Sequence, residues 1–266
     1  MSDRIRWINM NESTVDIAER TFQIERPGGI VPGVAWLPQE HAKSCPLVLL
    51  GHGGSGHKKN ERNVLLGKWF ASTAGIAAVA IDGPFHGDRV GSPLTPVQYQ
   101  RKIEIEGMDA VATRMVSDWQ ATVAAINTLD FVDTTRLGYF GLSMGTRFGL
   151  PLCAAVGAAL RCAVFGKFGL SHAPGFYEGS DMTQQIRISA SQIVAPTLFH
   201  LQWDDELFPR EGQLELFDTL GSREKQLIAY AGAHGQTNPT AATTWTGFMA
   251  RHLRPGFPSQ ESIVAS

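Results

Sequence analysis

Short apolar segments alternate with helix-like segments from about residue 46 onward, and this alternation constrains the fold more than any other feature of the sequence. Apolar runs that predict strands cover residues 46–50, 76–81, 137–140, 162–165, 196–201 and 226–230. Apolar residues recur at helical spacing in the segments 60–73, 108–129, 150–160, 213–220 and 242–253. Apolar strands that alternate with helices are typical of a parallel sheet with helices on both faces. We therefore predict an α/β fold built on a mostly parallel sheet.

Two further strands are predicted ahead of this pattern, at residues 15–24 and 31–37. We expect them to pair as an antiparallel edge of the sheet. The sequence contains no internal repeat, linker or low-complexity segment. We predict one domain over residues 1–266, with residues 1–30 in the N-terminal edge and residues 256–266 as a flexible tail.

The composition is that of an ordinary globular protein, with 43% hydrophobic and 18% charged residues. The net charge of −2 gives no reason to expect nucleic acid or an anionic membrane as a partner. Three cysteines without a C-x-x-C pair argue against a disulfide scaffold and a thiolate zinc site. We find neither a signal peptide nor a stretch of about 20 apolar residues. We expect a soluble, cytoplasmic protein, and the sequence assigns no oligomeric state.

One local cluster of positive charge is formed by Lys58, Lys59 and Arg62. We interpret it as a solvated helix face, because charged runs on a helix usually face water. The alternative is a role in steering an anionic substrate.

The segment Gly51-His52-Gly53-Gly54-Ser55-Gly56 follows a predicted strand and allows two interpretations. Its spacing fits G-x-G-x-x-G, which binds dinucleotide phosphates in this context. A His-Gly-Gly loop after a strand also holds the oxyanion of an acyl-transfer reaction. The dinucleotide interpretation needs an acid about 20 residues further on, whereas Asp82 lies 31 residues after Gly51 (82 − 51). The residues after Gly56 are also polar, which disfavours an NAD-dependent dehydrogenase.

The segment Gly141-Leu142-Ser143-Met144-Gly145 fits G-x-S-x-G and lies between a predicted strand and a helix-like segment. In this context the serine occupies a sharp, strained turn, and the two glycines remove collisions between side chains. The turn presents Ser143 at the carboxyl edge of the sheet, where ligands bind in open α/β folds. The amide of Met144 can donate to an oxyanion. Pro151, early in the following helix, is expected to end or kink it.

A serine nucleophile needs a base, and the base needs a group that fixes its orientation. Four histidines follow Ser143 in the sequence: His172, His200, His234 and His252. We predict His234 as the base, because it lies in a loop of small residues after the last strand. His200 falls inside a predicted strand, where a packed histidine is expected. For the orienting acid, the loop after residues 196–201 offers Asp204, Asp205 and Glu206, and the residues alone do not separate them.

Taken in order, these motifs resemble the α/β-hydrolase superfamily, and within it the serine carboxylesterases and dienelactone-hydrolase-like proteins. The resemblance spans residues 30–254 and rests on the segments 52–54, 141–145, 205–209 and 232–235. Asp205-Glu206-Leu207-Phe208-Pro209 is similar to the family segment D-x-x-V-P, whose first Asp is the orienting acid. The resemblance therefore assigns Asp205 to this role, and it implies an α/β-hydrolase fold.

The resemblance also implies a reaction, the cleavage of a carboxylic ester through an acyl-enzyme formed on Ser143. Backbone amides of Gly54 and Met144 are expected to hold the oxyanion, with Ser55 as the alternative to Gly54. We expect a small-molecule ester as the partner and neither a metal nor an organic cofactor. His52 is expected to shape its loop rather than act as a base.

The chain departs from this family in one position that matters for substrate. Dienelactone hydrolases carry Cys at the elbow, so Ser143 argues against dienelactones as substrates. No large cap domain fits between residues 170 and 193, so we expect a minimal lid shaped by residues 84–107 and 171–182, including Phe176 and Tyr177. Thioesterase or lactonase activity on the same residues, and a non-catalytic binding protein of this fold, are the remaining alternatives.

Overall fold

The computed structural model describes residues 5–13, 16–39, 44–174 and 181–258. The described strands are β1 (Ile5–Ser13), β2 (Ile17–Arg26), β3 (Gly29–Pro38), β4 (Cys45–Leu50), β5 (Ala77–Ile81), β6 (Val132–Phe140), β7 (Leu160–Gly166), β8 (Thr197–Gln202) and β9 (Lys225–Tyr230). The described α-helices are α1 (Glu61–Ser72), α2 (Pro96–Glu106), α3 (Met108–Ile126), α4 (Met144–Val156), α5 (Thr183–Gln192), α6 (Arg210–Thr219) and α7 (Ala241–Leu253).

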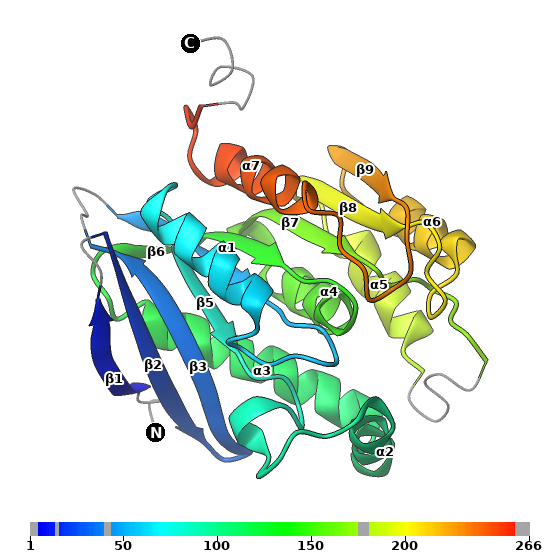
Figure 1. Cartoon of the computed structure of the whole chain (residues 1–266), viewed down its shortest axis with the longest axis horizontal. Coiled ribbons are helices and arrows are strands. Elements are labelled where there is room, and N and C mark those ends of the chain that lie inside the picture. The colour runs from blue at the N-terminus through cyan, green and yellow to red at the C-terminus, as the bar shows by residue number, and fades with distance from the viewer. Residues whose placement is uncertain (1–4, 14–15, 40–43, 175–180, 259–266) are drawn as a thin grey trace.

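The strands form a nine-stranded sheet in the order β1-β2-β3-β5-β4-β6-β7-β8-β9 (Figure 1). Neighbouring strands from β5 to β9 run parallel. The pairs β1–β2, β2–β3 and β3–β5 are antiparallel. The predicted mostly parallel sheet with an antiparallel N-terminal edge is thereby confirmed, and β1 extends that edge by a strand that we did not predict separately.

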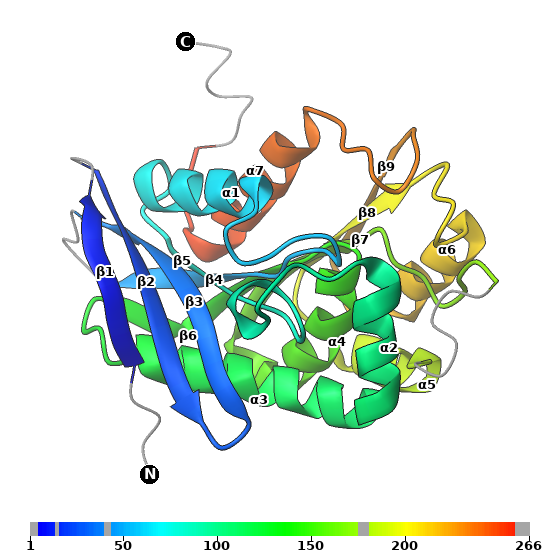
Figure 2. The same ribbon diagram turned by 60° about the horizontal axis from the view of Figure 1, so that its bottom comes forward.

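Helices cover both faces of this sheet, as the alternation of side chains along a strand requires. In β4, Leu47 and Leu49 belong to one buried cluster, and Val48 and Leu50 belong to the other. The first cluster includes residues of α2 to α6, and the second includes residues of α1 and α7. Figure 2 shows α1 and α7 on the opposite side of the sheet from α2, α3, α4 and α5. Burial on both faces explains why β4 and β5 read as continuous apolar runs.

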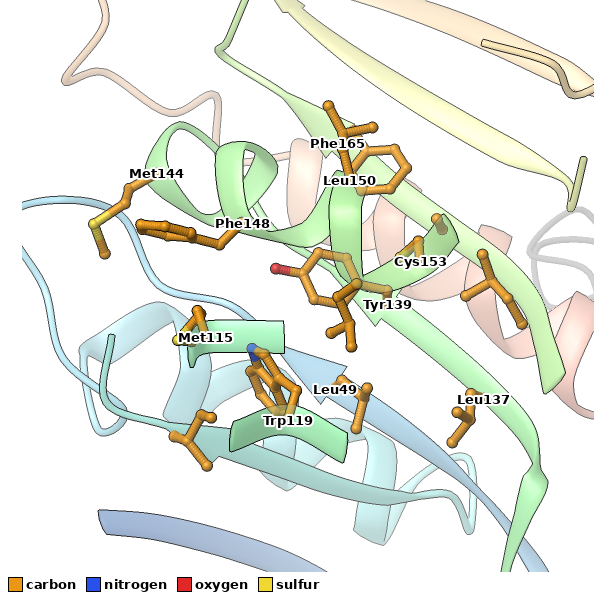
Figure 3. Packing of buried hydrophobic residues seen from close by; sticks show 14 of the residues in the cluster. Leu49, Met115, Trp119, Leu137, Tyr139, Met144, Phe148, Leu150, Cys153 and Phe165 are labelled. Carbon is orange, nitrogen blue, oxygen red and sulfur yellow. The ribbon is translucent and has the colours of Figure 1, made fainter. Parts of the chain in front are cut away.

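Tyr139 on β6 packs against the first turns of α4 and holds them in place. Its ring packs between Trp119 and Phe165, with ring centroids 6.5 Å and 5.8 Å away (Figure 3). Its hydroxyl donates to the carbonyl of Gly145 at 2.6 Å. A Cβ at Gly149 would lie 2.2 Å from the ring, so a glycine is required for this close approach. The first turns of α4 are therefore held by both packing and a buried hydrogen bond.

The helix that carries Pro151 is continuous from Met144 to Val156, so Pro151 does not end it, and the first of the two expected outcomes, an end or a kink, is wrong. Proline removes one N–H from a helix interior and usually breaks it. Here every residue from Met144 to Cys153 is buried, and tertiary packing holds the turn around Pro151 in place. The helix also begins before residue 150, where the sequence pattern placed its start.

The interpretation of the basic cluster as a solvated helix face is wrong for two of its three members. The ammonium of Lys58 is buried and lies 2.7 Å from carboxylates of both Asp82 and Asp88. Lys59 pairs with Glu19 at 2.5 Å. Asp82 at the end of β5 is fully buried, and a buried carboxylate requires a cationic or hydrogen-bonding partner. Lys58 supplies both a side-chain and a backbone donor to it.

Two predicted segments, the lid segment 171–182 and the tail 256–266, lie partly outside the described residues. The residues outside include Phe176 and Tyr177 of the lid segment and residues 259–266 of the tail. Between β7 and β8 the described part contains only α5, as expected for a minimal lid. No helix among the described residues is long and apolar enough to span a membrane.

Candidate active site

Ser143 forms the turn between β6 and α4, and its backbone is strained. It has φ 58° and ψ −121°, a conformation that residues with a side chain rarely adopt. The turn is tied to the neighbouring strand, because the Ser143 amide donates to the Gly166 carbonyl at 2.9 Å and Thr146 Oγ1 donates to the same carbonyl at 2.8 Å. These bonds hold the strained residue at the carboxyl ends of β6 and β7.

The two glycines of the elbow are required by close backbone approaches. A Cβ at Gly141 would lie 2.7 Å from the backbone of Gly145. A Cβ at Gly145 would lie 3.2 Å from the carbonyl oxygen of Gly51. Backbone atoms cannot move aside as flexible side chains can, so any larger residue would displace the turn that carries Ser143. The structure agrees here with the steric argument from the sequence.

The structure brings the three predicted site side chains together. His234 lies in the loop after β9, and its Nε2 is 2.9 Å from Ser143 Oγ. Its Nδ1 is 2.8 Å from Asp205 Oδ2. Because a carboxylate only accepts hydrogen bonds, Nδ1 carries the proton in the neutral ring. Nε2 is then an acceptor that faces the serine hydroxyl.

Asp205 is the acid that contacts the ring, as the resemblance implied. Its side chain is fully buried. Its second oxygen, Oδ1, accepts the backbone N–H groups of Leu207 and Phe208, both at 2.9 Å. The carboxylate is therefore fixed from two sides, and burial strengthens its interaction with His234.

The loop of Gly53, Gly54 and Ser55 lies beside Ser143, and all four residues line a cavity of about 180 Å³. His52 holds this loop. The amide of Gly83 donates to His52 Nε2 at 2.7 Å, so the proton lies on Nδ1, which donates to the Gly53 carbonyl at 2.8 Å. Burial lowers the pKa of His52 to about 4. A buried histidine that is neutral at neutral pH and has both ring nitrogens hydrogen-bonded is suited to shape the loop, as we expected.

The residues expected to donate to an oxyanion lie in two places near Ser143. Gly54 and Ser55 line the cavity, and Met144 begins α4, where helical N–H groups have no partner within the helix. Tyr99 of α2 packs over this loop, because a Cβ at Gly54 would lie 2.2 Å from its hydroxyl oxygen. Pro96 and Tyr99 also line the cavity, so α2 forms its outer wall. We expected residues 84–107 to shape the pocket but did not predict this helix.

Lys167 is a site residue that sequence reasoning missed. It follows β7 with φ 47°, and it lines the cavity. Its Nζ donates to the carbonyls of His234 and Gln236 and to Thr237 Oγ1, so it anchors the loop that carries His234. Burial, and next the positive charge of Arg62, lower the pKa of Lys167 to about 8. Nothing in the local sequence marks a lysine for this position.

Two observations bear on other kinds of site. Asp82, which a dinucleotide-binding protein would need for its ribose, is fully buried and bound to Lys58. Among the described residues, His, Cys, Asp and Glu side chains form no group of three that could hold a metal ion.

Comparisons with known proteins identify structural relatives of the chain. The chain is 33% identical to a cold-adapted esterase from an Arctic intertidal metagenomic library, with a TM-score of 0.77 over 94% of this chain and 100% of that chain. Acetyl xylan esterase 1 from Thermoanaerobacterium has a TM-score of 0.73 at 15% identity, over 94% of this chain and 88% of that one. A dienelactone hydrolase from Anabaena variabilis has a TM-score of 0.61 at 18% identity, over 89% and 97%. The last two share the fold alone.

No protein-family model matches the chain, and no curated protein sequence does either. The structural relatives nevertheless span almost the whole chain, and the first of them exceeds 30% identity. The chain belongs to the esterases of the α/β-hydrolase superfamily and is a carboxylic ester hydrolase.

Proposed function

We propose that the chain hydrolyses a small carboxylic ester through an acyl-enzyme on Ser143. The observation that carries this proposal is the continuous series of contacts from Ser143 Oγ to His234 Nε2, and from His234 Nδ1 to Asp205. In the first step Ser143 Oγ attacks the ester carbonyl while His234 accepts its proton. The imidazolium that forms is stabilised by the buried carboxylate of Asp205.

The negative charge that develops on the carbonyl oxygen is stabilised by backbone amides of Met144 and of Gly54 or Ser55. Losing one such donor typically raises the barrier by about 3 kcal/mol. His234 then protonates the leaving alcohol. A water molecule, activated by the same histidine, attacks the acyl-enzyme and releases the acid. The cavity of about 180 Å³ beside Ser143 supports small or medium acyl and alcohol groups.

The decisive experiment is labelling with a fluorophosphonate probe, which forms a stable Oγ–P bond with an activated serine and releases fluoride. We expect wild type to be labelled and Ser143→Ala to be unlabelled, with the hydrolysis of p-nitrophenyl acetate lost in parallel. Ser171→Ala is the matched control, because Gly169-Leu170-Ser171 repeats the first half of the elbow motif without its second glycine. Equal labelling of wild type and Ser143→Ala would refute the proposal.

A second measurement addresses the base. The imidazole of His234 must be neutral to accept the serine proton, so kcat/KM should fall toward acid pH. A rate that is undiminished well below about pH 5 would contradict the role of His234.

A further inference from the structure

A second, larger cavity adjoins the catalytic one. Its volume is about 550 Å³, and it lies between the start of α1 and the segment before α7. The two cavities share three lining residues, Gly53, Ser55 and Arg62. Arg62 therefore borders both the space beside Ser143 and the larger space next to it.

Arg62 is a cation without a counter-charge among the residues that the structure describes. It forms no hydrogen bond or ion pair there, in contrast to Lys58 and Lys59 of the same cluster. Its side chain is partly buried, and burial lowers the pKa of the guanidinium. A partly desolvated charge is unfavourable unless an opposite charge pairs with it. The position of Arg62 at the border of both cavities thus favours pairing with an anion from outside the protein.

The other charged groups at the site are already engaged or face elsewhere. Lys167 raises the positive potential of the cavity, but all its donors are bound to the His234 loop. Asp205 and Glu206 accept hydrogen bonds from the side chain and the backbone of His234. Glu61 borders the larger cavity without pairing with Arg62 in the described part of the chain. Arg62 and Lys167 also repel each other, and an anion between the cavities would relieve this repulsion.

We propose that Arg62 binds a carboxylate of the substrate, so that the preferred substrates are esters that carry a second, ionised carboxyl group. The inference rests on the proposed esterase function and names its substrate class. A guanidinium suits this role because its planar array of donors matches a carboxylate in two parallel hydrogen bonds. From the sequence alone, the basic cluster at residues 58, 59 and 62 had an alternative role, the steering of an anionic substrate. Within this cluster we assign that role to Arg62.

The test compares two esters that differ only in charge at one end, monomethyl adipate and methyl hexanoate. The measured quantity is the ratio of kcat/KM for the anionic ester to kcat/KM for the neutral ester. We expect wild type to prefer the anionic ester and this ratio to fall about 10- to 100-fold in Arg62→Gln, which loses a charge-assisted hydrogen bond. Arg62→Lys should restore part of the ratio, and 0.5 M NaCl should reduce it in wild type.

Lys68→Gln is the matched control, because it removes the same charge from an exposed position of the same helix. The proposal is overturned if Arg62→Gln leaves the ratio unchanged, or if Lys68→Gln lowers it equally. In either case the esterase function stands, since wild type still hydrolyses the esters and Ser143→Ala does not.

A binding measurement separates the two proposals further. If wild type hydrolysed neither ester, the proposed function would fail, but the carboxylate site could still be tested. Calorimetric titration with adipate should then give binding that is about 10- to 100-fold weaker in Arg62→Gln. Equal binding to both proteins, or none to wild type, overturns the carboxylate site.

Discussion

Three consecutive acids follow β8, and each contacts a different part of the loop that carries His234. Asp204 accepts the amide of Gly232 at 2.9 Å, and Glu206 accepts the amide of His234 at 2.8 Å. Asp205 alone contacts the imidazole. All three acids therefore hold the loop, and one of them, Asp205, also contacts the ring. Only the middle one can influence the proton on His234.

This division of roles makes Asp205→Asn and Glu206→Gln a sensitive pair of variants. Asn at position 205 can direct an N–H toward Nδ1 and favour the wrong tautomer of His234. We expect kcat to fall by about 10³- to 10⁴-fold. Gln at position 206 retains an oxygen that can accept the His234 amide, so we expect less than about a tenfold loss. Steady-state kinetics with p-nitrophenyl acetate measure both. A comparable loss in the two variants would mean that Asp205 acts only by holding the loop.

At the scale of elements, α2 supports the loop of Gly53, Gly54 and Ser55, which we propose holds the oxyanion. Tyr99 of α2 lies against Gly54, and the ring of His86 packs beside Tyr99, with the two ring centroids 4.6 Å apart. His86 Nε2 is 2.9 Å from the Gly54 carbonyl. His52, His86 and Tyr99 therefore all contact the loop and restrict its movement. Its amides are held in place before any substrate arrives, which is what electrostatic stabilisation of an oxyanion requires.

A methyl group at Gly54 should disturb this arrangement. In Gly54→Ala the new Cβ meets the Tyr99 hydroxyl, and the loop or α2 must shift. A displacement of about 1 Å of catalytic groups can cost about 100-fold in rate, so we expect a loss of that order in kcat/KM. Removing the obstructing oxygen in Gly54→Ala/Tyr99→Phe should recover part of it.

Gly54→Ala, Tyr99→Phe and the double variant form a double-mutant cycle, in which the single variant Tyr99→Phe is the control. If the double variant were no more active than Gly54→Ala, contact between α2 and the loop would not explain the requirement for glycine at position 54. Thermal denaturation of each variant shows whether the fold is intact.

At the scale of the molecule, two buried histidines make stability depend on pH. Burial lowers the pKa of His52 and of His200 from an ordinary value of 6.5 to about 4. Above about pH 6.5 both are neutral in the folded and the unfolded chain. As the pH falls toward about 4, the unfolded chain binds protons at these positions and the folded chain does not. The free energy of unfolding therefore decreases through this window.

The contribution of His200 can be isolated with His200→Phe, since the ring stacks on Tyr230 and Phe keeps a ring there. Urea unfolding at pH 7.5 and pH 5 gives the change in the free energy of unfolding for each protein. We expect this change to be about 2 kcal/mol smaller in the variant than in wild type. An identical pH dependence in both proteins would show that His200 takes up its proton in the folded state.

The sequence predicted those parts of the fold whose signals are local. Apolar runs identified β4 and β5, and the glycine spacing around Ser143 identified the elbow. By contrast, α2 was missed because only Tyr99 and Ile103 in it are buried, which gives a weak helical period.

Side-chain partners that come from distant elements could not be predicted. Lys58 is buried because Asp82 lies at the end of a neighbouring strand. Lys167 reaches the His234 loop only because β7 ends beside it. Asp205 was chosen over Asp204 and Glu206 by family resemblance, since three adjacent acids look alike until the histidine loop is in place.

The contact between Ser143 and His234 joins positions 91 residues apart in the sequence. It forms only when β6, β8 and the segment after β9 have all taken their places in the sheet. Non-local pairings of this kind are slow steps in folding. The recovery of ester hydrolysis therefore reports a late stage of refolding. A chain that has formed its helices and only part of its sheet is still inactive.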